Sequence, residues 1–172
     1  CVAPDGSVFV ADWYDPGVGG HRMGDVQRGR IFRIAPPNTA YKVPMLEVSN
    51  IEGAIEALQS PNLATRYLAW TALHEQGAAA EQALVERYEN GKPHIQARAL
   101  WLLGKIDGKR ANYIQKGLTH DNPDLRITAL RLALQEDEAN ILDYVEQLVN
   151  DKNPQVRREA ALALRFEDSA KA

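Results

Sequence analysis

One loop of the sequence gathers residue types that could bind a cation or an anion. Between residues 12 and 25 it holds three carboxylates, one imidazole and one guanidinium: Asp12, Asp15, His21, Arg22 and Asp25. Carboxylates and imidazoles are ligands for divalent cations, and a guanidinium can hold an anionic substrate group. The five residues lack a fixed ligand spacing, and loop aspartates commonly cap turns by accepting from backbone N–H groups. Turn capping is the favoured interpretation, and a metal or substrate site in a larger protein is the alternative.

A second set of charged residues recurs along the chain. Each of four prolines is followed three or five residues later by an arginine, which pairs Pro61 with Arg66, Pro93 with Arg98, Pro123 with Arg126, and Pro154 with Arg157. Such a column could line a concave face and hold a phosphate backbone. However, Asp121, Asp124 and Asp151 lie close by in sequence, and the net charge of −3 gives no basic footprint for nucleic acid. We therefore expect ion pairs between repeats, each contributing about 0–1 kcal/mol where exposed.

The other reactive residue types favour structural roles. Cys1 is the single cysteine, so the sequence offers no internal disulfide and no Cys-x-x-Cys motif for zinc or haem. We expect His74, His94 and His120 at helix ends or in loops, and Trp70 and Trp101 in the core. No nucleophile and base stand at a recognisable spacing, so we predict no catalytic or cofactor-binding residue in this chain.

The four prolines also define a repeat. They are spaced by 32, 30 and 31 residues, and a period of this length is typical of helical solenoids. Proline suits the first position of a helix, where its missing N–H has no partner to lose. Ser60, Asn122 and Asn153 precede three of them and are expected N-caps, whereas Lys92 before Pro93 predicts a weaker or differently capped helix start.

The pattern predicts a mostly α fold, an α-α superhelix of about four helical pairs with a small N-terminal β-hairpin and loop. We expect the hairpin and its long loop in residues 1–40, with strands near 7–13 and 30–34, a linker in 41–50, and the solenoid in 51–172. The predicted pairs are 51–59 with 62–75, 79–90 with 94–106, 110–119 with 124–136, and 139–150 with 154–166. Paired helices bury their apolar stripes only by stacking, so the repeats should share one core.

The hairpin has an expected place in this fold. Two strands alone are marginally stable in water, and these two carry many apolar residues, so we expect the hairpin to cover the apolar side of the first helical pair. The sequence has no run of about 18 apolar residues, and no membrane span is expected. It begins at Cys1, without an initiator methionine, and we expect it to be a piece of a longer polypeptide.

Residues 51–167 resemble short bacterial HEAT repeats. The likeness rests on the pattern Asn-Pro-x-(Val/Leu)-Arg-x-x-Ala, which stands at residues 122–129 and again at 153–160. The resemblance implies a helical scaffold that binds neighbouring domains of its parent protein or another protein.

The first 37 residues resemble the last blade of a glucose/sorbosone-dehydrogenase-like β-propeller. The residues that carry this likeness are 3–14, Gly19-Gly20-His21-Arg22 and 29–36. In putative membrane-bound dehydrogenases such a propeller precedes HEAT repeats. The resemblance implies a secreted or periplasmic bacterial parent that uses quinone, calcium or haem. Most of the propeller and any haem-attachment motif are missing from this chain, so we expect no cofactor in it.

Three functional hypotheses follow. The first is a non-catalytic scaffold for domain–domain or protein–protein contacts. The second places the loop around His21 at the active-site rim of a quinone- or metal-dependent sugar dehydrogenase. The third is nucleic-acid binding through the arginine column, against which the acidic charge balance argues.

Overall fold

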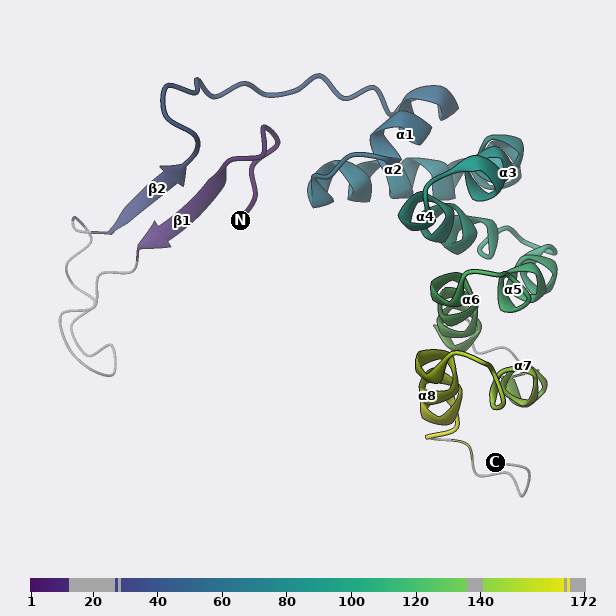
Figure 1. Ribbon diagram of the computed structural model, residues 1–172. Helices are drawn as coiled ribbons and strands as arrows, with labels where there is room; N and C mark the ends of the chain where they lie inside the picture. Colours follow the sequence, from purple (N-terminus) through teal and green to yellow (C-terminus); the bar gives the residue numbers. More distant parts are fainter. Residues whose placement is uncertain (13–26, 28, 136–140, 166, 168–172) are drawn as a thin grey trace, which may run out of the picture.

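The computed structural model describes residues 1–12, 27, 29–135, 141–165 and 167 (Figure 1). Two strands, β1 (Val8–Asp12) and β2 (Arg30–Ile34), form an antiparallel sheet in which Val8 pairs with Ile34 and Asp12 with Arg30. Both strands fall within the ranges predicted from their β-branched and aromatic residues.

Eight α-helices follow the strands in the described residues. In chain order they are α1 (Ile51–Leu58), α2 (Leu63–Gln76), α3 (Glu81–Asn90), α4 (Pro93–Leu103), α5 (Arg110–Leu118), α6 (Pro123–Gln135), α7 (Ile141–Leu148) and α8 (Pro154–Ala163), with a 3-10 turn at Gly77–Ala80. Figure 1 shows an arc whose inner layer holds α2, α4, α6 and α8, while α3, α5 and α7 form the outer layer. The predicted fold class, a mostly helical solenoid with a small two-stranded sheet, is confirmed.

Asparagine side chains start three of the four inner helices. Asn153 accepts hydrogen bonds from the N–H groups of Gln155 and Val156, and Asn122 accepts one from that of Asp124. The first inner helix differs from the prediction, because α2 begins at Leu63 and its N-cap is Asn62 rather than Ser60. Pro61 therefore lies in the loop before the helix. The amide oxygen of an asparagine can accept hydrogen bonds from the free N–H groups of a first helical turn. Asn62 has the extended backbone that allows its side chain to do so.

The second inner helix has the weak start that its sequence predicted. Lys92 occupies the N-cap position of α4 and its side chain makes no capping hydrogen bond. Pro93 at the first helical position has no N–H to satisfy, which lowers the number of unpaired donors at this end.

One apolar core runs through all four helical pairs. It begins at Ala54 in α1 and extends to Ala163 in α8, and its fully buried large side chains are Leu58, Leu73, Leu84, Leu100, Leu103, Ile114, Leu125, Leu130, Leu132, Leu148 and Val156. Within the inner layer α4 packs on α6 and α6 on α8. Each pair thus buries its apolar stripe against the next, as the repeat period predicts.

Alanines allow the inner helices to approach one another. Ala69, Ala99, Ala129 and Ala160 are fully buried, and each lies seven residues after the N-cap position of its helix. Aligning the repeats on their arginines would put Trp101 at this position in the second repeat. Ala99 fills it, because the helix start and not the arginine sets the structural alignment of the repeats.

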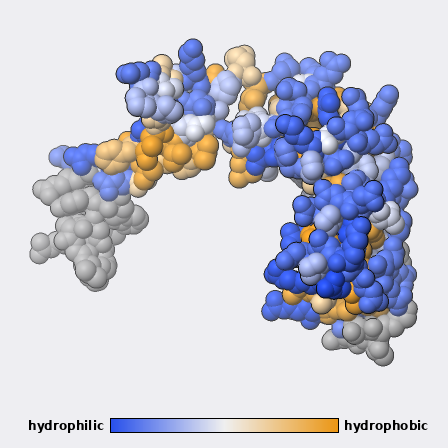
Figure 2. Space-filling view, in the orientation of Figure 1, coloured by the Kyte–Doolittle hydropathy of each residue, from blue (hydrophilic) through white to orange (hydrophobic). Residues whose placement is uncertain are grey.

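The hairpin does not cover the first helical pair with its apolar residues. Val8, Val10, Phe32 and Ile34 share one face of the sheet and all four are exposed. Figure 2 shows this apolar surface over the hairpin. The contact with the helices lies elsewhere, since the Asn62 amide donates to the carbonyl of Ala3 at 2.8 Å.

The other face of the sheet explains this arrangement. Arg33 donates to the Asp5 carboxylate at 2.9 Å and to the Ser7 hydroxyl at 3.1 Å, and Phe9 meets Tyr41 edge-on. These contacts hold the loops around the hairpin on that face and leave its apolar face outward.

None of the helices in the described residues is long and apolar enough to cross a membrane.

Candidate functional site

Three arginines of the predicted column make the same contact. Each lies four residues after the N-cap asparagine of its inner helix and donates from Nη1 to two carbonyls in the loop before that helix. Arg66 reaches Ser60 and Pro61 at 3.0 and 2.7 Å, and Arg126 reaches His120 and Asp121 at 2.6 and 2.9 Å. Arg157 repeats this with Asp151 and Lys152 at 2.8 and 3.3 Å. The arginines therefore tie each loop to its inner helix.

Arg98 is not the fourth member of this column. The equivalent residue in the second repeat is Gln96, whose side-chain amide donates to the carbonyl of Tyr88 at 2.8 Å. Arg98 lies two residues later and reaches back to the preceding repeat, where Nη1 donates to the carbonyl of Leu58 at 2.9 Å. In the sequence, the arginine follows the proline by three residues in two repeats and by five in the others. This unequal spacing hid the shift of Arg98, because Pro61 lies outside its helix.

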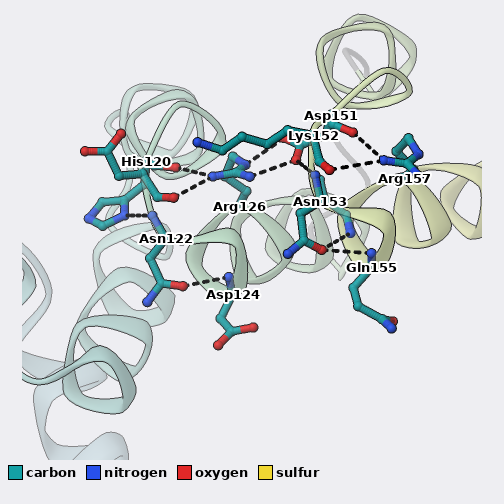
Figure 3. A network of polar contacts seen from close by, with 11 residues as sticks. His120, Asn122, Asp124, Arg126, Asp151, Lys152, Asn153, Gln155 and Arg157 are labelled. Carbon is teal, nitrogen blue, oxygen red and sulfur yellow. Dashed lines mark hydrogen bonds and ion pairs between the residues drawn. The ribbon is translucent and has the colours of Figure 1, made fainter.

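One arginine of the column forms the expected ion pair between repeats. Arg126 holds Asp151 with two parallel hydrogen bonds of 2.8 Å from Nε and Nη2, as Figure 3 shows. Both side chains are buried, at 7% and 10% exposure. The hydrogen bonds from Arg126 lower the pKa of the Asp151 carboxyl, against the opposing effect of its burial.

The other expected ion partners act differently. Asp121 contacts Arg126 through its backbone carbonyl. Asp124 donates its N–H to the capping Asn122 (Figure 3). Arg66, Arg98 and Arg157 donate to backbone carbonyls, and no described carboxylate forms an ion pair with them. The expectation of carboxylate partners along the whole column is therefore corrected to one pair, because carbonyls of the loops satisfy the other guanidinium groups.

A groove of about 500 Å³ opens on the inner helices α2 and α4 and reaches α6. Its lining is mostly apolar and aromatic and includes three arginines. The lining residues are Leu58, Leu63, Arg66, Tyr67, Trp70, Ala97, Arg98, Trp101, Thr128 and Arg131. Figure 1 places α2 and α4 on the inner side of the arc. The groove is therefore a concave surface shared by neighbouring repeats.

The aromatic side chains of the groove are accessible. Tyr67 is 66% exposed and Leu63 is 68% exposed, although both are large apolar side chains. Trp70 stacks on His74 with ring centroids 4.9 Å apart. Trp70 and Trp101 were expected in the core. They pack against it but stay partly exposed, so each has one side on the core and one on the groove.

The charges of the groove differ between its two ends. At the α6 end Arg131 pairs with Glu159 at 2.9 Å. At the other end Arg66 and Arg98 lie among apolar side chains with carbonyl partners. Burial lowers the pKa of the Arg98 guanidinium, and the positive charge of Arg66 lowers it further. In the part of the chain that the structure describes, this end of the groove therefore carries positive charge without a paired carboxylate.

The loop with the candidate metal or substrate ligands is described at its first residue. Asp12 ends β1 and faces Arg30 across the sheet. Asp15, His21, Arg22 and Asp25 lie outside the described residues. Within the described part of the chain, no group of three or more His, Cys, Asp or Glu residues could hold a metal ion.

Comparison with known families agrees with the geometry. A profile of HEAT repeats matches residues 51–135, and a HEAT repeat profile matches residues 141–165. A search of curated proteins finds no match to this chain. The two matched ranges contain the eight helices that the structure describes, the shared core and the groove. Residues 51–165 of this chain therefore belong to the HEAT-repeat family.

Proposed function

We propose that this chain is a non-catalytic scaffold that binds a protein partner through the groove on α2 and α4. HEAT repeats are typically scaffolds for protein–protein interaction, and the family match supports the same role here. The observation that carries the proposal is the set of accessible aromatic side chains beside arginines on a concave surface.

The composition of the groove fits this role. Trp, Tyr and Arg are the residue types that contribute most to the binding energy of protein interfaces. Exposed Leu63 and Tyr67 stand beside each other on one helix, one turn apart, and form a surface that a partner could bury. The rigid inner helices hold these side chains in place, which reduces the entropy lost on binding.

Selection of random peptides displayed on phage against the full chain tests the proposal. We expect enriched peptides whose binding falls by roughly tenfold or more when Tyr67→Ser or Leu63→Ser is introduced. Both positions are exposed, so neither change should unfold the chain. Leu162→Ser is the matched control, because Leu162 is an exposed leucine of the inner helix α8 outside the groove. Peptides that bind equally to all three variants would refute this use of the groove.

A proposal about the parent protein rests on the first 37 residues. Their resemblance to a propeller blade, together with the outward apolar face of β1 and β2, supports a hairpin that belongs to a larger sheet of a dehydrogenase-like protein. In such a parent the loop of His21 and Asp25 would stand at the rim of an active site with a quinone or metal. Titration of a longer protein with calcium or quinone tests this idea, and unchanged affinity after His21→Ala and Asp25→Ala would remove the loop from the site.

A further inference from the structure

We infer that the groove on α2 and α4 recognises an acidic peptide segment in which a carboxylate stands beside a large apolar side chain. This inference rests on the proposed scaffold function and adds the chemistry of the partner. The carboxylate would lie at Arg66 and Arg98, and the apolar side chain would contact Tyr67, Trp70 and Trp101.

Among the described residues, the positive end of the groove lacks the acid that the junction of the third and fourth repeats has. Arg126 in the third repeat meets Asp151, which lies two residues before the N-cap of the fourth repeat. Arg66 occupies the equivalent place in the first repeat, but Asn90 stands where the second repeat would need the acid. Arg126 shows that an arginine in this position can hold a carboxylate with two bonds, whereas no carboxylate of the described residues pairs with Arg66.

Arg98 adds a second charge at the same end. Its guanidinium donates to the carbonyl of Leu58 at the end of α1, next to the loop in which Arg66 donates to the carbonyls of Ser60 and Pro61. In both side chains Nη1 makes these bonds, and the other nitrogens have donor capacity left for a ligand. The pKa of the Arg98 guanidinium is lowered, because burial and the charge of Arg66 both disfavour its protonated form. A bound carboxylate would offset both effects.

The apolar part of the groove favours a peptide over a nucleic acid. Tyr67, Trp70, Trp101 and Leu63 offer a surface that a leucine, phenylalanine or tryptophan side chain of a peptide could cover. A polyanion would also meet a chain with a net charge of −3, which opposes its approach at low salt. One or two carboxylates on a short segment match the local charge without needing a wide basic surface.

The composition of the selected phage peptides gives the first test. We expect Asp or Glu next to an aromatic or aliphatic residue in the enriched set. Synthetic peptides with such a sequence, and the same peptides with Asn and Gln in place of the acids, are then compared by fluorescence polarisation on the full chain. We expect the acidic form to bind roughly tenfold to a hundredfold more tightly, with the difference shrinking as salt is raised.

Substitution of Arg66 locates the charge effect. Arg66→Gln should remove most of the preference for the acidic peptide, and Arg66→Glu should shift the preference toward the same peptide with lysines. Arg157→Gln is the matched control, because Arg157 makes the same two carbonyl contacts in its own loop and lies outside the groove. Circular dichroism and a thermal melt of each variant show whether the fold is kept.

The outcomes separate this inference from the function on which it rests. Enriched peptides that need Tyr67 but carry no acid, or that ignore Arg66→Gln, overturn the acidic partner and leave the scaffold standing. If the selection yields no peptide whose binding depends on Tyr67, both the acidic partner and the scaffold function are overturned. A thymidine oligonucleotide could compete more strongly than the acidic peptide and lose this effect in Arg66→Gln. That result would assign the charged end of the groove to nucleic acid instead.

Discussion

At the scale of single residues, the ion pair of Arg126 and Asp151 is a buried polar contact between the third and fourth repeats. It is buried, it has two parallel hydrogen bonds, and the same arginine also holds two loop carbonyls. Asp151 in turn accepts from the N–H of Asn153, which caps the next inner helix. One residue pair therefore joins two loops, two helices and two repeats (Figure 3).

Removal of the Asp151 charge should weaken the chain markedly. Asp151→Asn leaves the Arg126 guanidinium buried without its counter-ion, and we expect the free energy of unfolding to fall by about 3 kcal/mol. Urea titration followed by circular dichroism measures it. Glu159→Gln is the control, because its partner Arg131 is 58% exposed and such pairs contribute about 0–1 kcal/mol. Equal losses in the two variants would show that burial does not strengthen the Asp151 contact.

The same pair predicts a pH dependence. Arg126 lowers the pKa of Asp151 in the folded chain, so the ionised carboxylate stabilises the fold above the unfolded-state pKa of about 3.9. This contribution is lost as the pH falls through the lower folded-state pKa. The difference in unfolding free energy between the native chain and Asp151→Asn should stay constant near neutral pH and shrink below about pH 4. A difference that grows on acidification would contradict this assignment.

At the scale of helices, the distance between the layers depends on small residues. Gly117 lies in α5, and a Cβ atom there would come within 2.6 Å of Ala129 Cβ in α6 and 2.8 Å of Leu100 Cδ2 in α4. The outer helix therefore packs on two inner helices through a position without a side chain. Its glycine costs helix propensity and is required by the close approach.

Gly117→Ala should destabilise the chain although alanine favours helices. The added methyl group forces α5 away from α6, with an expected loss of about 1–3 kcal/mol, against a gain of about 1 kcal/mol in propensity. Thermal unfolding followed by circular dichroism measures the net effect. Asn112→Ala is the control, since Asn112 is exposed on the same helix and its replacement should be neutral or slightly stabilising. A melting temperature raised equally by both changes would exclude the packing argument.

At the scale of the whole molecule, the helical pairs form the stable body and the first fifty residues attach to its end. Among the described residues the contiguous buried core begins at Ala54, and Val48 and Ile51 join it as partly buried neighbours. The hairpin meets the helices through the bonds from Asn62 to the carbonyls of Ala3 and Pro4. The solenoid should therefore fold without the hairpin.

Deletion of residues 1–46 tests this division. The shorter chain keeps Val48 and the capping Asn50 of α1, so we expect its unfolding free energy to fall by about 1 kcal/mol or less, the contribution of the lost hydrogen bonds. Far-ultraviolet circular dichroism should show the helices retained, and urea titration gives the stability. A chain that loses its helical signal would show that the hairpin is part of the cooperative unit.

The sequence predicted those features that depend on neighbouring residues. The limits of β2, the start of α8 at Pro154 and the cap at Asn153 follow from backbone preferences that act within one turn or strand. The period of about thirty residues likewise predicted the shared core, because every apolar stripe recurs with it. The weak start of α4 was also visible in Lys92.

Contacts between repeats had to come from the tertiary structure. The spacing of prolines and arginines in the sequence put Arg98 in the column, whereas the start of α4 puts Gln96 there. This shift of two residues turns Arg98 toward the first repeat. The groove beside Trp101 and the outward face of the hairpin follow from such placements as well. A local pattern fixes where a helix begins and which side is apolar, but the partner of each exposed group depends on how whole helices pack, and that energy is spread over residues far apart in the chain.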